Sequence, residues 1–275
     1  ISAWSYPEGL RIGLSTDARA AEAQAAALDE AVSVLNLCQV KALRKGDEYV
    51  IPAAAPKLPK APALPMDPAL AAYVLAVPAM AGGFARLSGE LTLAAPVLAD
   101  FKALGLAPAF EGGAAICRSA PLNAGQSLGM GRDPRYVALA IALALKAGGA
   151  TVALPSGLAG TACRAWAMDL LDRLGAAFSS TDEPGDDTLV ITSGPQSVWE
   201  NVWTAPDAWC SMGLALISFI RPGIALDNPG GLAALWPRFW ALFNSLPIAR
   251  DPAPAPKEPE KHDAKPKNRR VRVSG

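Results

Sequence analysis

The chain has 275 residues, of which 51% are hydrophobic and 18% are charged. That is enough apolar material to bury a large core in one or two globular domains, which excludes a disordered chain. With 25 Lys and Arg against 25 Asp and Glu, no net charge attracts nucleic acid or an anionic membrane surface, so neither partner is expected.

The first regular pattern predicts one strand-and-helix unit near the start of the chain. It consists of a strand at residues 10–14, a helix at residues 18–37 and a strand at residues 49–51. We interpret residues 1–51 as a partial unit left from a second, incomplete domain. Residues 52–65 hold five prolines among Ala and Lys, and this composition predicts an extended connection.

Residues 66–248 contain a similar pattern three times. In each copy an Asp precedes an apolar helix, the helix ends at Gly or Pro, and a short strand and a second helix follow. The apolar helices are expected at residues 70–80, 137–146 and 211–220. The interval from the Asp to the Gly or Pro is the same in every copy: Asp67 to Gly82, Asp133 to Gly148, and Asp207 to Pro222. Such a constant interval indicates an internal repeat.

The remaining elements of each copy follow in the same order. Strands are expected after the apolar helices at residues 84–87, 151–154 and 224–226. The second helices are expected to end near Leu104 and Leu174 and, in the last copy, to cover residues 235–246. Residues 114–117 and 188–192 are predicted to close the first two copies as strands.

Residues 137–145 show no polar stripe, so this helix is predicted to lie at the centre of the domain with sheets packed around it. We therefore predict an α/β (α+β) fold in which repeated βαβαββ units form a closed domain of pseudo-threefold order around buried central helices. An Asp before each of these helices can accept hydrogen bonds from free backbone N–H groups, and Gly after the helix can end it.

Residues 249–275 combine many prolines with charges and predict a flexible tail. Its basic residues could bind an acidic partner or RNA, but a short basic terminus more often only aids solubility. The longest apolar runs are about half the roughly 20 residues that a membrane-spanning helix needs. The cysteines lack paired metal-ligand spacing, so we expect reduced thiols, no metal, no cofactor and a cytoplasmic location. The start without Met indicates a fragment.

Several segments resemble the C-terminal portion of the enolpyruvyl transferase family, which includes 5-enolpyruvylshikimate-3-phosphate synthase. Leu174-Gly175-Ala176 matches the end of a family helix, Asp207-Ala208-Trp209 stands where the family has Asp-His-Arg, and residues 234–240 stand where it has Lys, Ser or Thr, Phe and Pro. The likeness covers roughly residues 10–246. It implies an α/β prism and the C-terminal half of a two-domain protein that packs against a missing N-terminal domain or a second protomer.

The family joins the enolpyruvyl group of phosphoenolpyruvate to shikimate 3-phosphate in aromatic amino acid biosynthesis. That reaction needs carboxylates for proton transfer and cations for two anionic substrates. Most family positions for these groups are occupied here by other residues: Arg135, Gly160, Thr161, Ala208, Trp209 and Ala234. Only Arg164 and Asp207 keep the family residue type.

Two functions remain open. The first is that of a 3-phosphoshikimate 1-carboxyvinyltransferase, with Asp207 and Asp133 as candidate catalytic residues and Arg164 and Arg135 as candidate ligands for substrate or another small anion. Helix capping is the alternative role for both aspartates and for Asp67. The second function is that of a non-catalytic binding or scaffold protein derived from the family, because the replaced groups leave an inactive or incomplete site.

Overall fold

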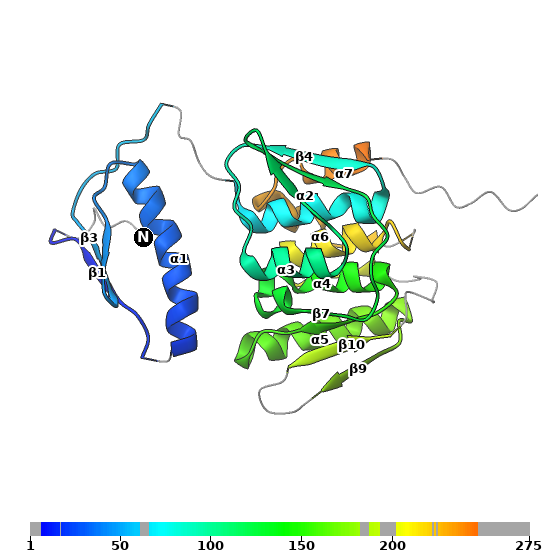
Figure 1. The fold of residues 1–275 in the computed structure, drawn as a ribbon. Helices are drawn as coiled ribbons and strands as arrows, with labels where there is room; N and C mark the ends of the chain where they lie inside the picture. The colour runs from blue at the N-terminus through cyan, green and yellow to red at the C-terminus, as the bar shows by residue number, and fades with distance from the viewer. Residues whose placement is uncertain are drawn as a thin grey trace, which may run out of the picture. The chain divides into compact units, whose positions relative to one another are not determined.

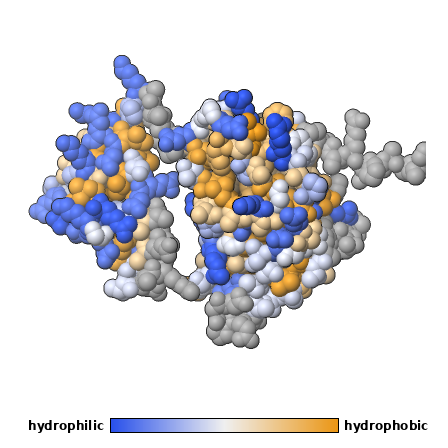
Figure 2. Space-filling model, in the orientation of Figure 1, coloured by the Kyte–Doolittle hydropathy of each residue, from blue (hydrophilic) through white to orange (hydrophobic). Residues whose placement is uncertain are grey.

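The computed structural model describes residues 7–16, 18–60, 66–181, 187–192, 202–221, 223 and 225–246. The chain divides into two compact units, Ile1–Met66 and Asp67–Gly275 (Figure 1). On the face seen in Figure 2, both units carry hydrophobic patches among hydrophilic residues. None of the described helices is both long and apolar enough to span a membrane. The predicted tail lies outside the described residues.

The smaller unit packs one helix on one sheet. Its elements are β1 (Leu10–Gly13), α1 (Ala18–Leu37), β2 (Leu43–Lys45) and β3 (Glu48–Ile51). The strands pair antiparallel in the order β1-β3-β2. A small cluster of Val40, Ala42 and Ile51 forms the core. The predicted strands and helix are confirmed, and β2 was missed because its residues are all exposed and show no apolar alternation.

The larger unit begins with α2 (Pro68–Ala81), β4 (Phe84–Ser88), α3 (Ala95–Ala103), β5 (Ala109–Glu111) and β6 (Ala114–Arg118). The three strands form an antiparallel sheet in the order β4-β6-β5. These elements confirm the helix, strand, helix and closing strand expected in the first copy. The short β5 was not predicted.

The second copy is the most complete. It contains β7 (Gln126–Leu128), the 3-10 helix η2 (Gly129–Arg132), α4 (Pro134–Ala147), β8 (Ala150–Ala153), α5 (Gly157–Leu174), β9 (Phe178–Thr181) and β10 (Thr188–Ile191). The strands are ordered β7-β8-β10-β9, with β7 parallel to β8 and the other pairs antiparallel. Gly148 ends α4 in the left-handed conformation, as expected for a glycine at this position.

The third copy contains β11 (Val202–Trp203), α6 (Ala208–Ile217), β12 (Ala225–Leu226), the 3-10 helix η3 (Pro229–Ala234) and α7 (Phe239–Ser245). Strand β11 pairs parallel with β12, as β7 does with β8. The helix expected at residues 235–246 is confirmed as α7, but its predicted start was too early. Pro237 disfavours helical backbone in the residue before it, so α7 starts only at Phe239.

Three of the sheets contain the same strand order: β1-β3-β2, β4-β6-β5 and, beside β7, β8-β10-β9. In each case a strand and a helix are followed by a hairpin whose second strand pairs with the first strand. The predicted α/β class is therefore confirmed. The pseudo-threefold prism remains a prediction.

Helices α2, α4 and α6 form the centre of the larger unit. Helix α4 packs against α6, and α2 packs against both. Every residue of α4 from Tyr136 to Leu145 is buried, and most residues of α2 and α6 are buried as well. Burial on all sides explains why these segments lack a polar stripe, and it confirms the prediction of buried helices.

Candidate functional site

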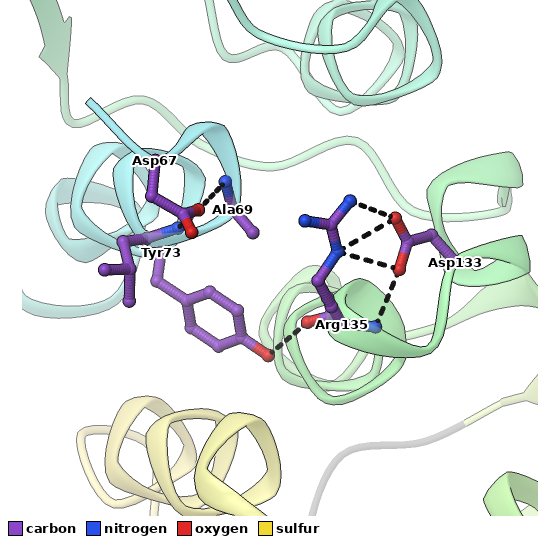
Figure 3. Close-up of polar contacts among 6 residues, drawn as sticks. Asp67, Ala69, Tyr73, Asp133 and Arg135 are labelled. Atoms are coloured by element: carbon purple, nitrogen blue, oxygen red, sulfur yellow. Dashed lines mark hydrogen bonds and ion pairs between the residues drawn. The ribbon is translucent and has the colours of Figure 1, made fainter. Parts of the chain in front are cut away.

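The first turns of the three central helices meet at one end of the bundle. Tyr73 lies in the second turn of α2, and its hydroxyl lies 3.0 Å from the backbone oxygen of Arg135 and 3.2 Å from that of Trp209. Arg135 belongs to the first turn of α4, and Trp209 belongs to the first turn of α6. The N-termini of α2, α4 and α6 therefore lie together (Figure 3).

We call this region the helix-end site, consisting of Asp67, Tyr73, Asp133, Arg135 and Asp207. The three aspartates precede the three helices, and each accepts backbone hydrogen bonds. Asp67 Oδ1 accepts from two amides in α2 at 2.7 and 3.0 Å. Asp133 Oδ1 accepts from the amide of Arg135 at 3.0 Å, and Asp207 Oδ1 accepts from that of Cys210 at 2.7 Å. The capping role predicted for all three is confirmed.

Arg135 is bound by the cap of its own helix. Its Nη2 lies 2.8 Å from Asp133 Oδ2, and its Nε lies 3.2 Å from each carboxylate oxygen (Figure 3). The hydrogen bond with Asp133 raises the pKa of Arg135 above its ordinary value. The two candidates Asp133 and Arg135 are thus brought together, but as a mutually satisfied pair.

Arg164 forms a different ion pair. It lies in α5, and its Nη2 contacts Asp187 Oδ1 at 2.5 Å. The two side chains are only 17% and 32% exposed, so this pair is better shielded from water than the pair of Arg135. The candidate cations Arg135 and Arg164 each have a carboxylate partner within the chain.

Two further groups here can ionise: the hydroxyl of Tyr73 and the thiol of Cys210, whose amide donates to Asp207. Burial raises the pKa of the Tyr73 hydroxyl and that of the Cys210 thiol well above their usual values. Both groups therefore stay protonated at neutral pH, and neither can act as a base. The described residues contain no cluster of three or more His, Cys, Asp or Glu side chains placed to hold a metal ion.

The sequence interpretation missed the role of Asp100. This residue is only 6% exposed, and its Oδ2 accepts a 2.6 Å hydrogen bond from the amide of Met130 in η2, directly before α4. Asp100 lies between Val97, Phe101 and Leu104, which are all buried. These four residues have the i, i+3, i+4, i+7 spacing of one helix face. An acidic residue on an otherwise apolar face was the sequence signal that Asp100 is buried and has a hydrogen-bond partner.

No protein-family model matches the sequence, and no curated protein matches it significantly. Solved structures do match. The enolpyruvyl transferase NikO from Streptomyces tendae has a TM-score of 0.54 at 16% identity, over 80% of this chain and 52% of NikO. EPSP synthase from Acinetobacter baumannii has a TM-score of 0.51 at 18% identity, over 78% of this chain and 53% of that enzyme.

These matches show a shared fold. The chain spans about half the length of each of these enzymes. The predicted resemblance to enolpyruvyl transferases is confirmed at the level of the fold, whereas the assignment to their C-terminal half remains a prediction. The roles of single residues are not carried over by similarity this low.

Proposed function

We propose that this chain is a non-catalytic relative of the enolpyruvyl transferases, which retains their fold and serves as a binding or scaffold protein. The observation that carries the proposal is the Asp133–Arg135 pair. The resemblance expects a catalytic carboxylate at position 135, and this chain has instead a guanidinium bonded to the helix cap. A permanently charged guanidinium cannot exchange protons with a substrate.

The charge of the helix-end site also opposes the family's substrates. Helix N-termini attract anions, but here Asp67, Asp133 and Asp207 already accept hydrogen bonds from first-turn amides. Three carboxylates and the guanidinium of Arg135 give the named residues of the site a net negative charge. Phosphoenolpyruvate and shikimate 3-phosphate are both anions, so the site would repel them.

A transferase is the second candidate, and it rests on Arg164. The resemblance places this residue at a family position that contacts phosphoenolpyruvate. An incoming phosphate or carboxylate would have to displace Asp187 from its 2.5 Å contact with the guanidinium. The displaced Asp187 carboxylate, which is 32% exposed, would lose this hydrogen bond, and that loss offsets part of what the new contact provides.

The test is an assay with both substrates. We expect the chain to release no inorganic phosphate from phosphoenolpyruvate and shikimate 3-phosphate, because the three carboxylates of the helix-end site cap helices and its guanidinium, Arg135, is paired with Asp133. Calorimetry with each substrate at millimolar concentration is expected to show no heat of binding. Phosphate release that requires both substrates and is lost in Arg164→Gln would contradict the proposal and support the transferase.

A scaffold protein acts by contacting another domain or protein. We propose that the chain packs against a further domain or a second protomer, which is supported by its covering about half the length of each matched enzyme. A cytoplasmic location is part of the same proposal. Sedimentation of the purified chain distinguishes self-association from a requirement for another protein.

A further inference from the structure

A largely apolar cavity lies in the larger unit, and Tyr73 of the helix-end site is part of its lining. It is half-open and is lined by α2, β4, α6, α7 and the segment between η3 and α7, and its volume is about 280 Å³. The half-buried Val74 and Val77 form the wall on α2, and the buried Leu216 forms the wall on α6. The opposite wall consists mainly of aromatic side chains from α7 and from the segment before it, including Phe243 and Trp236.

The size and lining of the cavity suit a small aromatic molecule. A dry apolar cavity of about 150 Å³ accommodates a benzene molecule, so the present volume has room for about two fused rings. The aromatic wall is held together by edge contacts of Phe239 with Trp236 and Trp240 at centroid distances of 5.5 and 5.0 Å. Rings that pack edge to face in this way also attract the ring of a ligand.

The strand that borders the cavity supplies positive charge. Arg86 of β4 lines the cavity, and no carboxylate of the described residues forms an ion pair with it. The guanidinium of Arg118 lies 5.7 Å from the ring of Phe84, another lining residue that is 64% exposed. Arg118 itself lines a different pocket, so Arg86 is the guanidinium of this cavity. An apolar cavity lined by one guanidinium complements a ligand with one ring system and one negative charge.

We propose that this cavity binds an aromatic carboxylate of about two rings, with the rings against Trp236 and Phe243 and the carboxylate at Arg86. The inference does not depend on the proposed scaffold function, because the cavity shares only Tyr73 with the helix-end site and none of the three capping aspartates lines it.

The experiment titrates the full chain into 2-naphthoate and follows the fluorescence anisotropy of the ligand. We expect saturable binding with one site per chain. The neutral 2-naphthamide should bind about five- to tenfold more weakly, because it cannot form the charged contact. Arg86→Gln should remove the preference for the carboxylate, whereas the exposed control Arg132→Gln should keep it.

A second variant tests the location of the rings. Val77→Phe places a larger side chain in the cavity from a half-buried position, so the fold should remain intact while both ligands lose affinity. Circular dichroism confirms folding of each variant. Absence of saturable binding to the full chain, equal affinity for the amide, or unchanged binding to a folded Val77→Phe variant would each overturn the proposal.

Discussion

Gly213→Leu is expected to lower the free energy of unfolding by about 3 kcal/mol or more. A Cβ atom at this position would lie 2.4 Å from the Cβ of Ala138 and 3.0 Å from its backbone oxygen. Because Gly213 is in α6 and Ala138 is in α4, any side chain here forces the two central helices apart. Urea unfolding measures this free energy. The midpoint temperature of thermal unfolding should fall by roughly 6 °C or more.

The matched control is Gly230→Leu. Gly230 is exposed in η3, and a Cβ atom there would meet no atom within 4 Å. The free energy of unfolding of this variant should stay within about 0.5 kcal/mol of that of the unmodified chain. Equal stability of the two variants would mean that α4 and α6 do not pack closely, which would refute the arrangement of the central helices.

Asp100→Ala is expected to lower the free energy of unfolding by about 2 to 3 kcal/mol, because the buried amide of Met130 loses its acceptor. Asp100→Asn keeps an acceptor oxygen and should cost less. Urea unfolding at neutral pH compares the two variants. If alanine and asparagine had the same effect, the hydrogen bond to Met130 would not be the source of the stabilisation.

Asp100 also makes the free energy of unfolding depend on pH. Burial raises the pKa of Asp100 above its ordinary value of 3.8, although hydrogen bonds from the amides of Met130 and Gly129 oppose this rise. The folded state therefore binds the proton more tightly than the unfolded state. The contribution of Asp100 to stability is largest below its ordinary pKa and declines as the pH rises through the folded pKa. Asp100→Asn should lack this decline.

The central helices could be predicted from the sequence because they combine three independent signals. Asp133 marks the start of α4, Gly148 marks its end, and the residues between them are apolar on every side. The short strands could not be predicted in this way. Strand β2 has three exposed residues with no apolar alternation, and β11 has two residues whose partner β12 lies more than 20 residues away.

The candidate site was predictable in part. The capping role of Asp67, Asp133 and Asp207 follows from their position before apolar helices, since this is local chemistry. The ion pair of Arg164 with Asp187 joins two segments of the second copy, and sequence spacing carries no information about such a contact. The convergence of three helix ends on the Tyr73 hydroxyl likewise depends on tertiary packing.

The most direct test of the central claim is a titration of the isotopically labelled chain with phosphoenolpyruvate, followed by nuclear magnetic resonance. The claim is that the helix-end site uses its polar groups to cap helices and to pair with each other. We therefore predict that the amide signals of Ala69, Arg135 and Cys210, which donate to the three caps, do not shift at millimolar ligand. Saturable shifts of these amides that disappear in Arg135→Gln would contradict the account.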